Sequence, residues 1–411
     1  MRIAIIGAGI IGVNAALALR VQGAEVTLYD REGVAAGASR GNAGIFADYA
    51  VLPEARPGLR REVPRMLLDR NGPLSIRLRH LPKLLPWLRD FIREGQPDRV
   101  ERSTTALSAL MKWVRPDWDR VLREAGCEDL RVSRGTLHVY RSPRAMHDAL
   151  PDWQVMGAHG VRFEPVMGQA LRDLEPALSR DFQAGVLMPD LSHALDPLGL
   201  TERLAAHARA RGCEFRQAEV SAISSTETGV CLHFPGAGTR AFDRAVIACG
   251  ARSDALTRPL GLPVPLESER GYNVTLPAAG VTLNRPVCLP ERGFYMTPMS
   301  VGLRIGGRVE LGGLIAPPRW SRADVMLRHA RNALPGLDPK GAKRWMGHRP
   351  SLPDTLPAIG PLPGQERIFA AFGHGHLGLT LAATTGRILA EMIYEIPPEI
   401  DPTPCLPARF A

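Results

Sequence analysis

The chain has 411 residues, of which 45% are hydrophobic and 23% are charged, the composition of a soluble globular protein large enough for two domains. The sequence argues against a membrane-spanning protein, because no stretch approaches the ~18 consecutive apolar residues that a spanning helix needs. The N-terminus lacks the layout of a secretory signal, and the six cysteines form no CxxC pair. We therefore expect a cytoplasmic protein with reduced thiols and no metal site.

The formal net charge of +9 is carried almost wholly by arginine, and the excess lies mainly in residues 56–93. Apolar residues are interleaved with the basic ones there, which is typical of an amphipathic helix. Two interpretations stay open: a solvated helical face, which is the commoner case, or a helix on an anionic membrane surface, peripheral on the inner membrane face. No zinc-finger spacing or aromatic-basic platform indicates a nucleic-acid partner. The basic residues concerned are Arg56, Arg60, Arg61, Arg65, Arg70, Arg77, Arg79, Lys83, Arg89 and Arg93.

The first thirty residues predict a complete βαβ unit. Residues 2–6 (RIAII) form a short branched apolar run, typical of a buried parallel strand. The glycine-rich stretch 7–12 then opens a helical segment that ends near Gly23, and residues 24–30 (AEVTLYD) predict the second strand.

The rest of the chain predicts mixed elements, which makes the fold class α/β. Residues 53–125 favour helices with proline breaks, and 198–212 favour an amphipathic helix closed by glycine. Strands are predicted at 136–140, 241–250 and 367–373, with several antiparallel strands across 270–315 and a final helix at 378–395.

The glycines of the first loop have distinct tasks in a dinucleotide site. Gly7 allows the tight turn, Gly9 lets a pyrophosphate approach the backbone, and Gly12 lets helix and strand pack closely. The helix N-terminus offers free N–H groups to the phosphates, and Asp30 at the end of the second strand suits ribose hydroxyls. This loop alone does not separate NAD from FAD.

A second glycine-rich turn near the C-terminus favours a flavin. Gly373, Gly375 and Gly378 lie between a predicted strand and a predicted helix. A second helix N-terminus aimed at the same crevice suits the pyrimidine end of a flavin, because reduced flavin carries negative charge there.

These segments resemble the D-amino-acid oxidase superfamily nearly end to end. The similar stretches are IAIIGAGIIG, ASRGNAGIF (38–46), LDPLGL (195–200), AEV (218–220), VIACGARS (246–253), GHRPSLPDTLPAIG (347–360) and GHGHLGLTLAATTGRILAE (373–391), and NGPLSIRLRHLPKLLPWLRDFI (71–92) is similar to the bacterial D-amino-acid dehydrogenase branch. The resemblance implies a Rossmann-like FAD-binding domain of glutathione-reductase type, at 1–54, 185–265 and 345–411. Interleaved with it, at 55–184 and 266–344, is an α+β substrate domain built on an antiparallel sheet.

The resemblance also implies the contacts to the cofactor. Asp30 and Arg31 would lie at the adenosine ribose, Val220 would place its backbone against adenine, and residues 373–380 would cradle the pyrimidine edge. No cysteine context for a covalent tether is present, so we expect non-covalent FAD. The full set of expected cofactor residues is Gly7, Gly9, Ile11, Gly12, Asp30, Arg31, Ser39, Arg40, Asn42, Gly44, Val220, Gly250, Gly373, Gly375, Leu377, Gly378, Leu379 and Thr380.

Four residues are candidates for handling the substrate. By resemblance, Arg349 binds a substrate carboxylate and Tyr295 lends its hydroxyl to the same group, which suits the need of a carboxylate for a planar bidentate cation. His376 replaces an arginine of glycine oxidase and is expected to face the substrate. His348 is a second candidate, whereas His374 is expected to have a structural role. Two imidazoles near a pocket suggest a hydroxylated or cyclic substrate.

The sequence thus predicts an FAD-dependent dehydrogenase of a small or cyclic D-amino acid, such as D-proline or cis-4-hydroxy-D-proline. Hydride would pass from the α carbon to flavin N5 and leave an imino acid. The electron acceptor is expected to be a quinone or an electron-transfer partner rather than oxygen. Three alternatives stay open: a glycine- or sarcosine-type oxidase that uses oxygen, a flavoprotein subunit of a heteromeric dehydrogenase and, least favoured, an NAD-binding module without catalysis.

Overall fold

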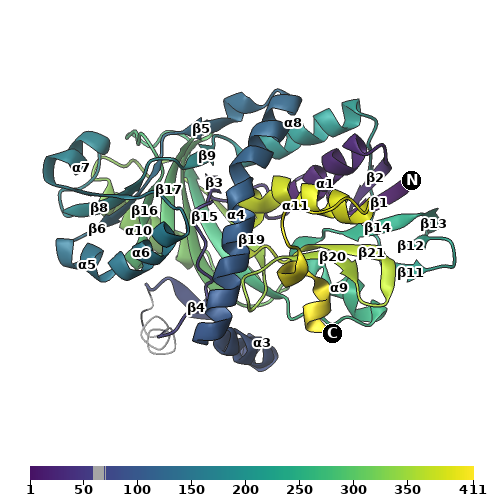
Figure 1. Ribbon diagram of the computed structural model, residues 1–411. Coiled ribbons are helices and arrows are strands. Elements are labelled where there is room, and N and C mark those ends of the chain that lie inside the picture. The colour runs from purple at the N-terminus through teal and green to yellow at the C-terminus, as the bar shows by residue number, and fades with distance from the viewer. Residues whose placement is uncertain (59–68, 70) are drawn as a thin grey trace.

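The computed structural model describes residues 1–58, 69 and 71–411. Two large sheets lie at opposite ends of an elongated molecule, and the long helix α4 (Pro97–Ala125) runs between them (Figure 1). Arg60, Arg61, Arg65 and Arg70 of the basic segment lie outside the described residues. None of the described helices is both long and apolar enough to cross a bilayer.

The first sheet has six strands, of which all but the last run parallel, and contains the βαβ unit that the sequence predicts. Alternate residues of β1 (Arg2–Ile6) face opposite sides: Ile3 and Ile5 pack on helices, whereas Ala4 and Ile6 pack towards a small antiparallel sheet. In spatial order, the strands are β10 (Glu214–Gln217), β2 (Glu25–Asp30), β1, β14 (Arg244–Ile247), β21 (Gln365–Phe372) and β20 (Ala358–Leu362).

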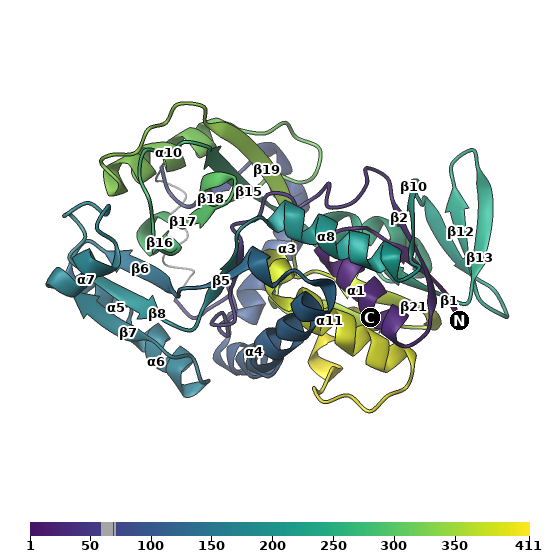
Figure 2. The ribbon, with the colours of Figure 1, turned by 90° about the horizontal axis from the view of Figure 1, so that it is seen from above.

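Helices cover one face of this sheet. Helix α1 (Ile10–Val21) lies between α8 (Pro197–Ala210) and α11 (Gly378–Ile393), as Figure 2 shows. A Cβ at Gly386 would lie 2.6 Å from the carbonyl oxygen of Asn14, so only glycine allows α11 to approach α1 this closely. The opposite face carries the small sheet of β11 (Ala222–Ser225), β12 (Val230–Phe234) and β13 (Gly238–Phe242), with the short helix α9 (Asp254–Thr257).

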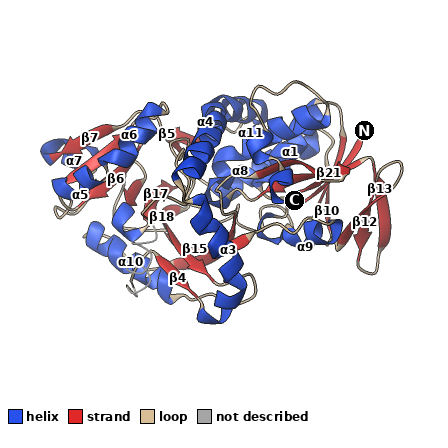
Figure 3. Ribbon diagram, turned by 60° about the horizontal axis from the view of Figure 1, so that its bottom comes forward, coloured by secondary structure: helices blue, strands red, loops and turns tan. Residues whose placement is uncertain are grey.

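The second sheet has nine strands and is largely antiparallel, with α10 (Ser321–Ala333) packed against it (Figure 3). The peripheral helices are α3 (Leu81–Glu94), α5 (Pro143–Asp148), α6 (Leu150–Ala158) and α7 (Gly168–Leu174), and a separate three-stranded sheet joins β3 (Ile45–Phe46), β9 (Ser192–Ala194) and β5 (Arg131–Ser133). The strands of the nine-stranded sheet are β19 (Lys343–Ser351), β15 (Glu267–Leu276), β18 (Gly302–Leu311), β17 (Phe294–Met299), β16 (Val287–Leu289), β6 (Thr136–Tyr140), β8 (Ala184–Met188), β7 (Glu164–Met167) and β4 (Leu74–Ile76).

The structure corrects several details of the predicted elements. Residues 345–351 were expected in the FAD-binding domain, but β19 pairs with β15 along its whole length and so belongs to the nine-stranded sheet. The single strand predicted at 241–250 is two strands, because the chain turns at Asp243 between β13 and β14. Pro86 and Pro116 lie inside α3 and α4 instead of breaking them, since buried apolar contacts compensate for the lost hydrogen bond.

Candidate active site

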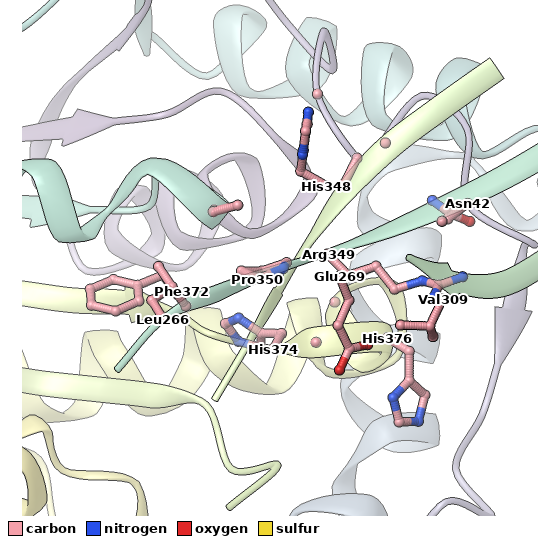
Figure 4. Close-up of a pocket in the computed structure, with 18 of the residues that line it drawn as sticks. Asn42, Leu266, Glu269, Val309, His348, Arg349, Pro350, Phe372, His374 and His376 are labelled. Carbon is pink, nitrogen blue, oxygen red and sulfur yellow. The ribbon is translucent and has the colours of Figure 1, made fainter. Parts of the chain in front are cut away.

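A cavity of about 2070 Å³ lies between the two large sheets and is lined by residues of both. Ligand pockets for small molecules usually measure about 300–1,000 Å³, so this one has room for a dinucleotide and a substrate together. Figure 4 shows the part of it where β15, β19 and the turn before α11 meet.

The N-terminal glycine turn forms one end of the cavity. A Cβ at Gly7 (φ +113°) would lie 2.3 Å from the carbonyl oxygen of Ala248, and one at Gly12 only 2.0 Å from that of Gly7. A Cβ at Gly9, by contrast, would meet only the hydroxyl of Ser39, at 3.1 Å, and Gly9 lines the cavity. Gly7 and Gly12 therefore allow the strand–helix packing, while Gly9 leaves room for a ligand at the N-terminus of α1.

Asp30 organises this end of the cavity as well as lining it. Its Oδ2 accepts a hydrogen bond from the Ala8 N–H (2.9 Å), and its Oδ1 accepts from the N–H groups of Glu32 (2.9 Å) and Gly33 (3.0 Å). The carboxylate thus joins the glycine turn to the loop after β2. Its remaining lone pairs are the acceptors that a ribose hydroxyl would use.

The loop at residues 39–44 lines the cavity next. The Ser39 hydroxyl accepts from the Ile10 N–H at 2.9 Å, and Asn42 Oδ1 accepts from the Gly44 N–H at 2.8 Å. A Cβ at Gly41 would lie 2.4 Å from the ring of Trp345, so this loop packs tightly beneath β19.

Most of the expected cofactor residues line the cavity, which fits an extended dinucleotide. Five do not. Arg40 is exposed, Leu377 and Thr380 are fully buried, Gly12 packs helix α1 against the Gly7 backbone, and Gly373 lies in the turn before α11. The ones that line it are Gly7, Gly9, Ile11, Asp30, Arg31, Ser39, Asn42, Gly44, Val220, Gly250, Gly375, Gly378 and Leu379.

The C-terminal glycine turn closes the other end of the cavity. Gly373 (φ +84°) and Gly375 (φ +51°) adopt left-handed backbone, which brings the first turn of α11 to the cavity. His374 between them is buried, and its Nε2 lies 2.9 Å from the Thr385 hydroxyl. Burial lowers the pKa of His374 to about 3, so the ring is neutral and holds the turn to α11.

Arg349 lines the same cavity. It stands directly opposite Glu269 on the neighbouring antiparallel strand, and its guanidinium lies over Gly271, where a Cβ would be 2.6 Å from Nη2. Its Nη1 donates to the carbonyl oxygen of Arg308 at 3.0 Å. The rest of the guanidinium is available to a planar anion.

Two carboxyl groups that sequence reasoning missed, Glu54 and Glu269, lie beside Arg349 and His376 (Figure 4 labels Glu269, Arg349 and His376). His376 Nδ1 lies 3.0 Å from Glu54 Oε1. Burial opposes ionisation of Glu54, but the charges of His376 and Arg349 outweigh it and lower the pKa of Glu54 to about 2.

Glu269 behaves in the opposite way. Burial and then the negative charge of Glu54 raise the pKa of Glu269 to about 8, although Arg349 acts against the rise. At neutral pH the two carboxyl groups therefore share one proton, held mainly by Glu269.

Tyr295 lines the cavity within a hydrogen-bonded cluster of buried and partly buried rings. Its hydroxyl contacts the hydroxyl of Tyr49 and lies 3.0 Å from Nε2 of His138. Burial lowers the pKa of His138 to about 3 and raises that of Tyr295 well above its usual value, so both groups stay uncharged. Tyr49 and His138 carry no motif that sequence reasoning could have used.

His348 reaches the cavity from the other side of β19. Its Nδ1 lies 2.7 Å from the Ser268 hydroxyl, and in Figure 4 its ring points away from Arg349 and Glu269. Neighbouring residues of a strand face opposite sides, which separates His348 from Arg349. Burial and then the charge of Arg270 lower the pKa of His348 to about 4. The structure therefore groups Arg349 with His376 and leaves His348 apart.

The sequence matches the family model of FAD-dependent oxidoreductases (DAO) over residues 2–392. It is 36% identical to a D-amino-acid oxidase of Bradyrhizobium diazoefficiens, over 99% of this chain and 98% of that protein. It is 30% identical to a D-amino acid dehydrogenase of Methylobacterium nodulans, over 97% of each chain.

Solved structures show the same fold at lower identity. Glycine oxidase from Geobacillus kaustophilus superposes with a TM-score of 0.77 at 21% identity, covering 100% of this chain and 99% of the other. L-proline dehydrogenase from P. horikoshii superposes with a TM-score of 0.75 at 20% identity, covering 100% and 97%.

Proposed function

Because this chain belongs to the family of FAD-dependent oxidoreductases, we propose that it is a dehydrogenase that oxidises the Cα–N bond of a D-amino acid. The observation that carries the proposal is Arg349, which presents a guanidinium to the same cavity as both glycine turns. Relatives at 36% and 30% identity, named D-amino-acid oxidase and D-amino acid dehydrogenase, support the D configuration.

Bound FAD supplies a hydride acceptor at N5. The chain's own residues bind and orient the substrate. Arg349 pairs with the substrate carboxylate, and the Tyr295 hydroxyl donates a hydrogen bond to it. Tyr49 and His138 hold that hydroxyl in place. The imino acid product would hydrolyse to a 2-oxo acid, or would stay cyclic if the substrate is a proline analogue.

We further propose that the substrate is small or cyclic, such as D-proline or cis-4-hydroxy-D-proline. This proposal is supported by the Glu54 carboxylate beside Arg349 and His376, which offers an acceptor to a ring hydroxyl or a secondary amine. Screening D- and L-amino acids with an artificial electron acceptor tests it. Turnover restricted to L-amino acids would overturn the D assignment, and indifference to ring size would remove the preference for cyclic substrates.

FAD is proposed to bind without a covalent bond. Acid precipitation of the purified yellow protein should then release the flavin into the supernatant. Absorbance of the purified protein near ~450 nm, which an oxidised flavin gives, would exclude a module that binds only NAD.

The identity of the electron acceptor distinguishes the proposed dehydrogenase from an oxidase. We favour a quinone or an electron-transfer partner, whereas an oxidase that uses oxygen is favoured by the 36% identity to a protein named D-amino-acid oxidase. Stopped-flow reoxidation of the reduced enzyme decides between them, because rapid reaction with oxygen would establish the oxidase. Full dye-coupled turnover by the purified chain alone would remove the idea of an incomplete subunit.

Helix α3 and the turn before it are proposed to contact an anionic bilayer. Leu78, Leu85 and Ile92 recur every seven residues and are 81%, 56% and 42% exposed. Exposed basic side chains flank this apolar stripe at Arg79, Lys83, Arg89 and Arg93. An exposed apolar stripe with flanking cations suits anionic lipid headgroups, and α3 projects from one edge of the molecule (Figure 1).

A further inference from the structure

Glu269 has a buried carboxyl oxygen that the described residues leave without a partner. The residue is only 3% exposed and lines the cavity, yet its Oε2 has no hydrogen-bond partner in the part of the chain that the structure describes. Burying a polar atom without a hydrogen-bond partner destabilises the folded state. Such a cost is retained at sites where a ligand supplies the missing partner.

The groups that face Glu269 come from three elements. Glu54 belongs to the segment after β3, Arg349 and Ser351 belong to β19, and His376, which contacts Glu54, belongs to the turn before α11. Glu269 and Arg349 are cross-strand partners and project from the same face of their strands. In an amino acid the nitrogen is two bonds from the carboxylate carbon. A carboxylate held by Arg349 therefore places its amino group within reach of Glu269.

We infer that Glu269 is a catalytic residue that accepts a proton from the substrate's ammonium group before hydride transfer. The inference rests on the proposed function. In this step an N–H bond breaks and an O–H bond forms, so the ammonium becomes a neutral amine and the carboxylate becomes a carboxylic acid. The amine then has the lone pair that the departing hydride requires, and no oxidant takes part.

Glu54 has a supporting electrostatic task. It stays ionised, because His376 and Arg349 lower its pKa to about 2 against the effect of burial. Its negative charge attracts the ammonium and raises the proton affinity of Glu269 towards that of an amine. A small difference in proton affinity makes the transfer efficient in both directions. Glu54 is therefore a positioning residue that acts on Glu269 and on the ammonium group through its negative charge, and Glu269 is the group that accepts the proton.

The pH dependence of kcat/KM tests this division of roles. In the wild type kcat/KM should rise about tenfold per pH unit and level off near pH 8, where Glu269 is ionised. In Glu269→Gln the rise should continue to the substrate's own amine pKa, with a loss on the order of 10² at pH 8. In Glu54→Gln the plateau should begin at lower pH than in the wild type, because the charge that raises the pKa of Glu269 is gone.

Ligand binding gives a readout apart from turnover. The probes are 2-aminoisobutyrate, which has no α hydrogen to lose, and isobutyrate, which lacks the amine. Wild-type affinity for 2-aminoisobutyrate, followed by the flavin absorbance or by calorimetry, should rise up to about pH 8, and affinity for isobutyrate should fall. In Glu269→Gln neither change should occur around that pH.

The outcomes separate this inference from the proposed function. If the wild type oxidises D-amino acids but Glu269→Gln keeps the wild-type pH profile, the role of Glu269 is wrong and the function stands. If Glu54→Gln and Glu269→Gln move the profile in the same direction, their role is only structural and the inference fails. If no D-amino acid is oxidised, the proposed function itself is overturned.

Discussion

Arg349 and Glu269 stand opposite each other on the antiparallel strands β19 and β15, with Gly271 leaving the space that the guanidinium occupies. The cation proposed for the substrate carboxylate and the base proposed for the substrate ammonium group are thereby fixed to adjacent strands. Side chains on paired strands hold their separation more firmly than side chains on loops.

Replacing Arg349 should affect substrate binding far more than cofactor binding. Arg349→Ala should raise KM by roughly 30-fold or more, because a buried carboxylate would lose a charged partner worth about 2–4 kcal/mol. Arg349→Lys keeps the charge without the bidentate geometry and should recover only part of the loss. Steady-state kinetics and flavin content measure the two effects, and unchanged kinetics would place the carboxylate site elsewhere.

Protein stability should depend on the protonation of Glu269. Burial and then the charge of Glu54 raise its folded-state pKa to about 8, from an ordinary value of 4.5. The folded state therefore binds the extra proton, and the stabilisation is complete below the ordinary pKa and lost as the pH rises through about 8. This group should lower the free energy of unfolding by up to about 1.4 kcal/mol per pH unit in that window.

Urea unfolding of the wild type and Glu269→Gln at several pH values between about 5 and 8 checks this linkage. The variant should gain stability relative to the wild type as the pH rises. A constant difference across the window would mean that the folded and unfolded pKa values of Glu269 agree.

Gly12→Ala should abolish flavin binding by displacing helix α1. The new Cβ would lie 2.0 Å from the Gly7 carbonyl oxygen, which belongs to the backbone and has no room to move. Val21→Ala is the control, because Val21 lies on the same helix, is 58% exposed and does not line the cavity. Thermal unfolding and flavin absorbance should separate the two variants, and full flavin content in Gly12→Ala would contradict the packing role.

Tyr295→Phe should weaken substrate binding and remove a hydrogen bond from the buried cluster. His138 and Tyr49 would each lose a partner, so we expect a stability loss of about 1–3 kcal/mol and a raised KM. Tyr49→Phe breaks the same hydroxyl contact but leaves the Tyr295 hydroxyl for the substrate, so its KM should change less. Equal KM values in the two variants would show that Tyr295 acts only in packing.

The surface of α3 should bind vesicles that contain phosphatidylglycerol and release them as the salt concentration rises. A double variant, Leu85→Glu with Ile92→Glu, should sediment less with these vesicles. Val301→Glu, which changes a residue of similar exposure (40%) in the turn between β17 and β18, should bind like the wild type. Equal binding to uncharged phosphatidylcholine vesicles would contradict an electrostatic contact.

Local sequence patterns were enough for the cofactor end of the site. A strand, a glycine turn, a helix and an acidic residue follow one another within 30 residues, and the structure confirms that βαβ unit. Each part depends on backbone geometry that neighbouring residues dictate, such as the positive φ of Gly7. The same locality explains the predicted turn at Gly373 and the helix α11.

Local sequence patterns did not predict the groups that surround Arg349. Glu54, Glu269 and His376 are separated by more than a hundred residues in the chain, and no motif marks the two carboxyl groups. Strand β19 was assigned to the other domain, so the pairing that sets Glu269 against Arg349 could not be anticipated.

The sequence by itself determined two glycine turns that suit a flavin dinucleotide, because short-range steric rules govern glycine turns and helix starts. The candidate arginine came from the resemblance to a known family. Only the tertiary structure decided which groups surround that arginine. Strand register and burial set those neighbours, and they gave one carboxyl group a lowered pKa and the other a raised one. Such shifts depend on the distances between charges and on the exclusion of water, which arise only when distant segments pack together.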